Sequence, residues 1–456
     1  MKRLLPILLA FLVLILISCE GEFVQAGGSE TGESTSTSES TSTSGETTTN
    51  NEPALLNWST PVLLAPAGRF GKAYKLDDEH IVYGVQEDSE SSSTLYLKIF
   101  SVPDGTVVKE YEVYSVPRKE LSIASFIKEV GGTDENHVWM VYSVDGDAYE
   151  STNYLYYKTP TSVKRIDLTS KCGVKGSLSL SDSRNYGDIL YLPDSNPDEM
   201  GKTCVITFGD DSVSISKANT DEAFMYLVKT GGPLDFVAFT HSGYLVKVEN
   251  GATVNSIHIE NGAFSNMEMG EDGYIYASKG EITEEYVLKI DPNTLSIASG
   301  LVHESEVNMA DEYAIPYSNK ILFIFSKLDN WMQSTYKTWY AVLDEDLRVV
   351  KEATVMPYTL EYDIYASVAP AGYGVDSEGR LWTLAKSQDD QGHYSNHDDS
   401  PVVVFDKDGN LVATSGSARS VSGEKLFFNV FENKGVLIYK DWYYGNYYLI
   451  EYSMEE

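Results

Sequence analysis

Basic residues are scarce in this chain of 456 residues. It contains 34 Lys and Arg against 68 Asp and Glu, and its formal net charge is −34. A surface this acidic repels the phosphate backbone of nucleic acids and anionic lipid headgroups. The composition therefore argues against nucleic acid as a partner. Solubility or a high-salt environment explains the charge most simply, and the binding of divalent cations or of a cationic partner stays open.

Helical patterning is also missing. After the N-terminus, no segment of about a dozen residues keeps apolar side chains at positions i, i+3, i+4 and i+7. This argues against helical and α/β folds. Tyr is abundant, with 32 residues, and Tyr, Val, Ile, Thr and Phe all favour strands. We therefore predict an all-β protein.

The common catalytic motifs are absent. The sequence has no G-x-S-x-G elbow, no H-E-x-x-H motif, no Walker loop and no dinucleotide-binding glycine pattern. Its seven His residues are scattered, and two of them, His80 and His137, open equivalent apolar strands, which indicates a structural role. A catalytic pair of carboxylates would not stand out among 68 acidic residues. We therefore expect a non-catalytic protein, with an enzyme left open.

Cysteine is rare, with three residues at Cys19, Cys172 and Cys204. No Cys–His spacing indicates a zinc site. Two alternatives stay open for Cys172 and Cys204. They form a disulfide, which an oxidising compartment permits, or they are small core residues. A disulfide closing a loop of about 30 residues would stabilise the fold by roughly 3–4 kcal/mol.

The N-terminus has the layout of a signal peptide. Met1-Lys2-Arg3 is positive, and residues 4–17 form an apolar run that is short for a membrane span. The run ends in Leu16-Ile17-Ser18-Cys19, which resembles the lipobox of bacterial lipoproteins. The resemblance implies cleavage before Cys19, a diacylglycerol on its thiol and acylation, with palmitate for example, of the new N-terminus. Several acyl chains anchor a protein stably to a membrane.

The alternative for this segment is an ordinary signal peptide with an incidental Cys. By similarity to enteric sorting, Glu20 in place of Asp after the lipidated Cys favours the outer membrane or cell surface over the inner membrane. We therefore expect a membrane-anchored lipoprotein of the cell envelope.

Residues from Glu20 to about Glu52 are rich in Ser, Thr and Glu and contain no Lys or Arg. Such a composition buries too little apolar surface to fold, so we predict a disordered tether. The expected organisation is a signal peptide at 1–18, lipidated Cys19 with its tether at 19–54, and one domain at 55–456.

Within that domain, a turn followed by an aromatic-rich strand, which we expect to be the inner strand of its unit, recurs mostly every 50–60 residues, with one gap of about 30 between Tyr244 and Tyr274. The short gap marks a stripped-down unit or a miscount. The strands are HIVYGV from His80, HVWMVYSV from His137, DILYL from Asp188, YLVKV from Tyr244, YIYAS from Tyr274, KILFIFS from Lys320, RLWTLA from Arg380 and GVLIYKD from Gly435.

These units resemble the blades of a β-propeller, and Asp376, Gly379 and Trp382 follow the D-x-x-G-x-h-W pattern of regulator-type propeller repeats. The resemblance implies seven or eight four-stranded blades. A parallel solenoid and two packed sandwiches are the alternatives. The segment Trp58–Ala65 precedes the first unit, and the last unit has three strands only. We predict that this segment completes the last blade and closes the ring.

One loop, Gln388–Ser400, is rich in potential metal ligands. Oxygen ligands of Asp suit Ca²⁺, and His with Asp suits transition metals. The alternative is a solvated polar loop. No cofactor is required by the sequence, and Ca²⁺ is the candidate. The candidate ligands are Asp389, Asp390, His393, His397, Asp398 and Asp399.

We therefore predict an envelope lipoprotein, anchored through lipidated Cys19, whose propeller loops bind a protein partner or a glycan. The alternative function is an extracytoplasmic metal-assisted hydrolase or lyase with its site at the propeller channel.

Overall fold

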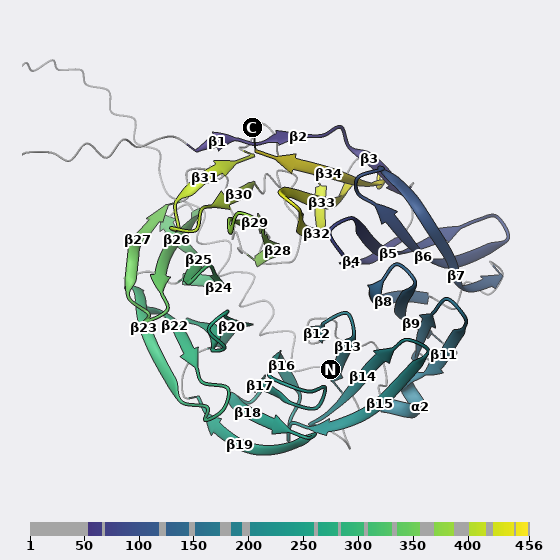
Figure 1. Cartoon of the computed structure of the whole chain (residues 1–456), viewed down its shortest axis with the longest axis horizontal. Helices are drawn as coiled ribbons and strands as arrows, with labels where there is room; N and C mark the ends of the chain where they lie inside the picture. Colours follow the sequence, from purple (N-terminus) through teal and green to yellow (C-terminus); the bar gives the residue numbers. More distant parts are fainter. Residues whose placement is uncertain are drawn as a thin grey trace, which may run out of the picture. The chain divides into compact units, whose positions relative to one another are not determined.

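The computed structural model describes residues 53–65, 69–117, 125–145, 151–173, 184–193, 201–259, 263–280, 284–304, 309–330, 335–355, 369–386, 401–415, 423–441 and 444–454. The chain divides into two units, Met1–Asn51 and Glu52–Glu456. All described residues belong to the second unit, where they form eight separate sheets. The sheets are arranged as the blades of a ring (Figure 1). The predicted all-β propeller is confirmed, with eight blades.

Blades 1 to 4 follow one another along the chain, each with four antiparallel strands in sequence order. Blade 1 comprises β4 (Arg69–Lys75), β5 (His80–Asp88), β6 (Ser92–Ser101) and β7 (Thr106–Pro117). Blade 2 comprises β8 (Ser125–Asp134), β9 (His137–Asp145), β10 (Ser151–Lys158) and β11 (Val163–Asp167). Blade 3 comprises β12 (Arg184–Asn185), β13 (Ile189–Pro193), β14 (Lys202–Gly209) and β15 (Ser212–Asn219). Blade 4 comprises β16 (Phe224–Lys229), β17 (Phe236–Thr240), β18 (Tyr244–Glu249) and β19 (Ala252–His258).

Blades 5 to 8 complete the ring. Blade 5 comprises β20 (Ala263–Met269), β21 (Ile275–Gly280), β22 (Glu284–Ile290) and β23 (Ile297–Glu304). Blade 6 comprises β24 (Met309–Tyr317), β25 (Lys320–Asn330), β26 (Thr335–Asp344) and β27 (Val349–Val355). Blade 7 comprises β28 (Ala369–Val375), β29 (Leu381–Lys386), β30 (Val402–Phe405) and β31 (Leu411–Thr414). Blade 8 comprises β32 (Gly423–Phe431), β33 (Lys434–Asp441) and β34 (Tyr447–Ser453).

The aromatic strands that the sequence suggested as innermost are in fact the second strands of their blades. The first strands, from β4 to β32, face the axis of the ring (Figure 1). The unit assigned to Tyr244 was miscounted, because Tyr244 opens the third strand of blade 4 and the second strand is β17. Blade 4 is therefore complete, and the short gap before Tyr274 does not mark a stripped-down blade.

The first strands escaped detection because most of them carry a β-bulge. Register shifts interrupt their pairing with the second strands between Phe224 and Tyr226, between Phe264 and Met267, and between Pro370 and Tyr373, with similar shifts in four other blades. An extra residue breaks the alternation of inward and outward side chains. A strand of this kind does not show the period of two that identifies strands in a sequence.

Buried apolar side chains join neighbouring blades, and in the described part of the chain they form eight clusters. Between blades 2 and 3, the ring of Trp139 stacks on Phe208 at a centroid distance of 4.9 Å, and its Nε1 donates a 2.9 Å hydrogen bond to the Gly187 carbonyl. Tyr191 donates in the same way to the Pro233 carbonyl of blade 4 at 3.0 Å. A buried aromatic thus fills the interface while its polar atom fixes the next blade.

Aspartates fix the turns between strands, and Asp376 of the D-x-x-G-x-h-W unit is the most buried of them. Its Oδ1 accepts the backbone N–H groups of Glu378 and Arg380 at 3.0 and 2.9 Å. Its Oδ2 accepts Nε of Arg380 at 2.6 Å and Nε1 of Trp382 at 2.8 Å. Gly379 takes φ 77°, which the turn requires and which glycine adopts without strain.

Comparable turns recur in other blades, where Asp77 and Asp134 accept the backbone N–H groups that follow them. Nδ1 of His80 lies 3.0 Å from Asp77, and Nδ1 of His137 lies 2.8 Å from Asp134. Both His residues therefore stabilise turns at equivalent positions, which agrees with the structural role expected of them.

Residues before the first blade close the ring. β2 (Asn57–Trp58) and β3 (Val62–Ala65) pair antiparallel with β34, so they supply the outer strand that blade 8 otherwise lacks. β1 (Ala54–Leu55) pairs parallel with β31 of blade 7. Figure 1 shows these purple strands along the outer edge of the yellow blades. The predicted closure by Trp58–Ala65 is present, and it extends to blade 7.

Cys172 and Cys204 are joined in a disulfide with their Cα atoms 5.5 Å apart. Cys172 ends the short helix α2 (Leu168–Cys172), which lies between blades 2 and 3, and Cys204 lies in β14. Asp167 caps this helix by accepting the N–H of Ser170 at 3.0 Å. Of the two alternatives left open by the sequence, the structure has the disulfide, which ties the connecting segment to blade 3.

Deleting residues 55–66 should abolish cooperative unfolding, because the deletion removes β2 and β3 and leaves the edge of β34 unpaired. Thermal unfolding followed by circular dichroism measures this. Deleting residues 25–45, which precede the first described strand, is the control and should retain one sharp transition. A 55–66 deletion that melts like the full chain would contradict this role of the closure.

Asp376→Ala should lower the free energy of unfolding by about 3 kcal/mol, because the buried Nε1 of Trp382 and Nε of Arg380 lose their acceptor. Glu378→Ala is the matched control. Its carboxylate also contacts Arg380, at 2.9 Å, but it is 60% exposed, so about 0.5 kcal/mol or less is expected. Urea unfolding measures both. Equal losses in the two variants would show that Asp376 has no special role.

Candidate functional site

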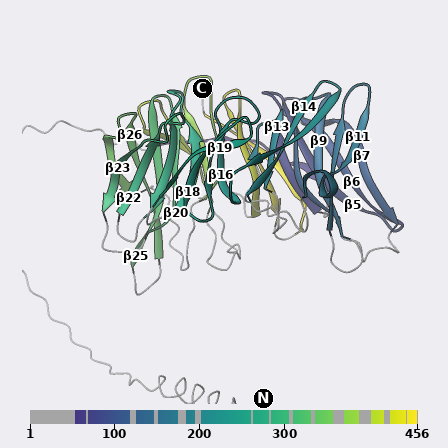
Figure 2. The ribbon, with the colours of Figure 1, turned by 90° about the horizontal axis from the view of Figure 1, so that it is seen from below.

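The two faces of the ring are built differently. In each blade, the turn between the first and second strands and the turn between the third and fourth strands lie on the same side of the ring. We call this side the turn face. Figure 2 shows these short turns along one edge of the ring. The connections from second to third strands, such as the one from Lys386 to Val402, leave on the opposite side.

A groove on the turn face lies between blades 4 and 5. Its volume is about 620 Å³, within the range of roughly 300–1,000 Å³ that is typical of ligand sites. Lys229, Asp235, Lys247, Glu249 and Met269 are among its lining residues. A neighbouring groove of about 310 Å³ between blades 3 and 4 shares Asp235 with it. The two grooves therefore border the same turn of blade 4.

The walls of the larger groove are held by hydrogen bonds. Asp235 accepts the N–H of Asn250 at 2.8 Å and that of Gly232 at 3.0 Å. Nζ of Lys247 contacts Glu249 at 2.7 Å and donates to the carbonyl of Asn293 at 2.9 Å, which links blade 4 to blade 5. The groove is thus largely preformed, which lowers the entropy lost when a ligand binds.

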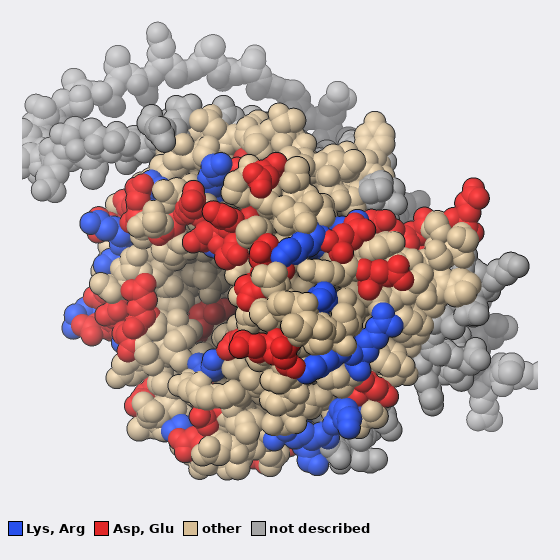
Figure 3. Space-filling view, turned by 45° about the vertical axis from the view of Figure 1, so that its right-hand side comes forward, with Lys and Arg blue, Asp and Glu red and all other residues tan. Residues whose placement is uncertain are grey.

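Polar side chains from several first strands converge inside the ring beside these grooves. Arg184 of β12 places its guanidinium 5.4 Å from the ring centroid of Tyr226 of β16. Tyr373 of β28 donates a hydrogen bond to the carboxylate of Glu268 of β20. We call Arg184, Tyr226, Glu268 and Tyr373 the channel cluster. Figure 3 shows a hollow in the ring with acidic side chains at its border and within it.

The bulges of the first strands position this cluster. Tyr226 and Tyr373 each follow directly on a register shift, and Glu268 is the residue after Met267, where the shift of β20 ends. A bulge rotates the strand locally and re-aims the side chains that follow. The same irregularity that conceals these strands in the sequence therefore brings tyrosines and a carboxylate from blades 4, 5 and 7 toward one place.

Desolvation dominates the electrostatics of the cluster. Burial raises the pKa of Glu268, and the opposing effects of Arg184 and of the Tyr373 hydrogen bond are smaller. Burial also raises the pKa of Tyr373 well above its usual value, and the charge of Glu268 raises it further. Glu268 is half-buried, and burial is the strongest influence on its pKa. Its charged form is therefore destabilised relative to a carboxylate in water.

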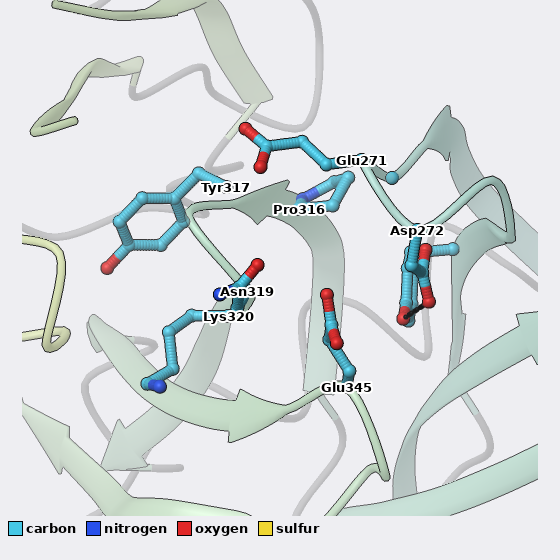
Figure 4. Close-up of a pocket in the computed structure, with 9 residues that line it drawn as sticks. Glu271, Asp272, Pro316, Tyr317, Asn319, Lys320 and Glu345 are labelled. Carbon is cyan, nitrogen blue, oxygen red and sulfur yellow. Dashed lines mark hydrogen bonds between the residues drawn. The ribbon is translucent and has the colours of Figure 1, made fainter.

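A second cavity lies between blades 5 and 6 and is too small for a ligand. Figure 4 shows Glu271, Asp272 and Glu345 around it. Its volume is about 10 Å³, which is close to the space of a single water. Asp272 is bonded to Tyr276 Oη at 2.9 Å and to Lys289 Nζ at 2.7 Å. Both partners of Asp272 belong to blade 5, and Nζ of Lys289 also donates to the carbonyl of Glu345 in blade 6 at 2.9 Å, which links the two blades.

Several of the predicted site residues lie outside the described residues. This holds for lipidated Cys19 and for the predicted metal ligands Asp389, Asp390, His393, His397, Asp398 and Asp399. In the sequence, Gln388–Ser400 stands between β29 and β30. Its binding of Ca²⁺ stays a prediction. Within the described ranges, no group of three His, Cys, Asp or Glu side chains is placed to hold a metal.

Sequence reasoning missed the channel cluster. Arg184 stands in a strand of two residues, and Glu268 is one of 68 acidic residues. The one available signal was their position, a few residues before a turn that precedes an aromatic strand. Among the described residues, no helix has the length and apolarity needed to cross a membrane.

Comparisons with known proteins assign this chain to no family. No protein-family model and no curated protein matches the sequence. Among solved structures, the chain is similar to the β-propeller domain of Cps50 (Swd1) of Myceliophteria thermophila, with 9% identity and a TM-score of 0.44 over 88% of this chain and 100% of that one. It is also similar to hydrazine synthase of Kuenenia stuttgartiensis, with 11% identity and a TM-score of 0.44 over 85% and 96% of the two chains. At these values the similarity carries no argument about function.

Glu268→Gln should stabilise the protein at pH 7–8, because glutamine keeps the acceptor for Tyr373 and removes a charge that burial disfavours. The native pKa of Glu268 lies above its unfolded value of about 4.3, so the cost of ionisation grows as the pH rises and vanishes below pH 4. A rise in melting temperature of about 1–2 °C at pH 8, lost at pH 4, is expected.

Glu271→Gln, at an exposed position of the adjacent turn, is the matched control because it changes the net charge equally. Differential scanning calorimetry from pH 4 to 8 compares the two variants. Identical pH profiles would show that Glu268 is solvated like a surface carboxylate.

Proposed function

We propose that this protein is an extracytoplasmic lipoprotein of the cell envelope, anchored through lipidated Cys19, whose propeller binds a protein partner or a glycan at the turn face. The outer membrane or the cell surface is the proposed location. The observation that carries the binding function is the ligand-sized groove between blades 4 and 5. The lipobox-like Leu16-Ile17-Ser18-Cys19 supports the anchor.

The arrangement suits binding for two physical reasons. The groove is bordered by backbone groups and by paired side chains such as Lys247 and Glu249, so it offers polar contacts without collapsing. Met269 adds an exposed apolar surface at its edge. A few polar groups beside apolar surface are the usual composition of a binding site.

The anchor is tested by metabolic labelling with an alkyne analogue of palmitate. Label should enter the native protein and the Cys172→Ser/Cys204→Ser variant, and it should be lost in Cys19→Ser. The cysteine variants at 172 and 204 control for palmitate on other thiols. Persistence of the label in Cys19→Ser would contradict the assignment.

The binding surface is tested with a photo-crosslinking amino acid in the native lipoprotein, still in its membranes. Position Asn293 lines the groove, and Val163, which is 51% exposed on the outer strand of blade 2, is the control. Crosslinked species should form from position 293 and not from position 163. Equal crosslinking at both positions, or none at 293, would contradict a binding site on the turn face.

A further inference from the structure

Two cations in this part of the ring, Arg184 of the channel cluster and Lys229, make few contacts through their charged ends, although the charge of Arg184 acts on the carboxylate of Glu268. Arg184 contacts the ring of Tyr226, but its guanidinium has no hydrogen-bond acceptor among the described residues. The same holds for Nζ of Lys229, which lines the groove between blades 4 and 5. Most basic side chains near an acidic surface acquire a partner, as Lys98 does with Glu87 and Glu110 at 2.6 and 2.9 Å. Arg184 and Lys229 keep their donors available.

Tyr186 connects the two cations. It follows Arg184 by two positions, and its hydroxyl accepts the backbone N–H of Lys229 at 3.1 Å. Arg184 and Lys229 therefore flank one tyrosine, on neighbouring first strands β12 and β16. The hydrogen bond uses only the backbone of Lys229, so it fixes the spacing of the two cations and leaves both charged ends free.

Apolar surface lies beside these cations. Tyr186 is 38% exposed, Met269 is 36% exposed and Tyr274 is 39% exposed. Tyr186 belongs to blade 3, and Met269 and Tyr274 border the first turn of blade 5, so these side chains lie on both sides of blade 4 at the turn face. The exposed rings of Tyr186 and Tyr274 offer flat faces to an apolar surface of a ligand.

The same sector also contains groups that can bind the hydroxyl groups of a ligand. The carboxylate of Glu268 accepts one hydrogen bond, from Tyr373, and a carboxylate has sites for about four. Glu268 precedes Met269 in β20, so the channel cluster and the groove share this strand. Carboxylate and phenol groups together accept and donate, which suits ligands with several hydroxyl groups.

We propose that this sector, comprising Arg184, Tyr186, Lys229, Glu268, Met269 and Tyr373, binds a carboxylated sugar, such as a uronate or a sialate, within a glycan. Arg184 binds the carboxylate through paired N–H groups, with Lys229 adding positive charge. Glu268 and Tyr373 bind sugar hydroxyls, and Tyr186 and Met269 cover the apolar face of the ring. The inference rests on the proposed binding function and names its ligand class.

Charge favours this ligand over other anions. A phosphate dianion would be repelled by Glu268, and a polyanion would be repelled by the net charge of −34. A single carboxylate is repelled less by Glu268 than a dianion is, and Arg184 and Lys229 attract it. Charges beyond about 8 Å are screened at physiological salt. A neutral sugar would make no use of the positive charges of Arg184 and Lys229.

Isothermal titration calorimetry with the full-length lipoprotein in detergent micelles tests the inference. The probes are D-glucuronate, N-acetylneuraminate and, as the neutral counterpart, D-glucose. At least one acid should bind about 10-fold or more tightly than glucose, and Arg184→Gln should remove this preference. Glu268→Gln should leave the preference intact or strengthen it, because a like charge is removed.

Lys434→Gln is the matched control, because it removes one positive charge from blade 8, away from the groove, at a side chain already paired with Glu451. It should change the affinity less than about 2-fold, while melting curves verify that each variant folds. Equal affinity for acids and glucose, no binding of either acid, or equal losses in Arg184→Gln and Lys434→Gln would each overturn the inference. If these results occur while position 293 still crosslinks to a partner, the proposed binding function stands without this ligand class.

Discussion

The antiparallel pairing of β2 and β3 with β34 is the interaction on which the ring depends. Every blade packs its apolar faces against two neighbours, so an open ring would expose a whole inter-blade interface and two strand edges. Leu56, which is completely buried, joins the cluster between blades 7 and 8, and Leu64 joins the cluster between blades 8 and 1. Residues that precede the first blade thus seal both contacts of the last.

A closed ring fixes where the first strands point. The second strands hold the backbones of the first strands in place. Each bulge in a first strand therefore rotates the side chains that follow it by a fixed amount. Tyr373 of blade 7 reaches Glu268 of blade 5 although blade 6 lies between them in the ring, so inner side chains of blades that are not neighbours meet. The contact could not form in an isolated blade. The chemistry of the channel is therefore a property of the assembled ring.

The turn face combines rigidity with unsatisfied groups. Aspartates such as Asp376 and Asp235 use both carboxylate oxygens to hold the turns. Arg184 and Lys229, in contrast, contribute little to the fold through hydrogen bonds to described residues. Groups of this kind, held in place by a preformed frame, are what recognition of a polar ligand requires. Because the protein as a whole is acidic, Arg184 and Lys229 make this sector of the ring less negative than the rest.

The sequence by itself determined the all-β class, the repeated blades and the closing role of Trp58–Ala65. Each of these depends on local patterns, namely aromatic strands such as those from His137 and Lys320 and aspartate turns such as that of Asp376. Only the tertiary structure decided the number of blades, the identity of the channel-facing strands and the pairing of Cys172 with Cys204. The first strands could not be identified in the sequence because their bulges interrupt the alternation of inward and outward side chains. The grouping of Arg184, Glu268 and Tyr373 depends on contacts between blades far apart in the chain, for which a single sequence carries no local signal.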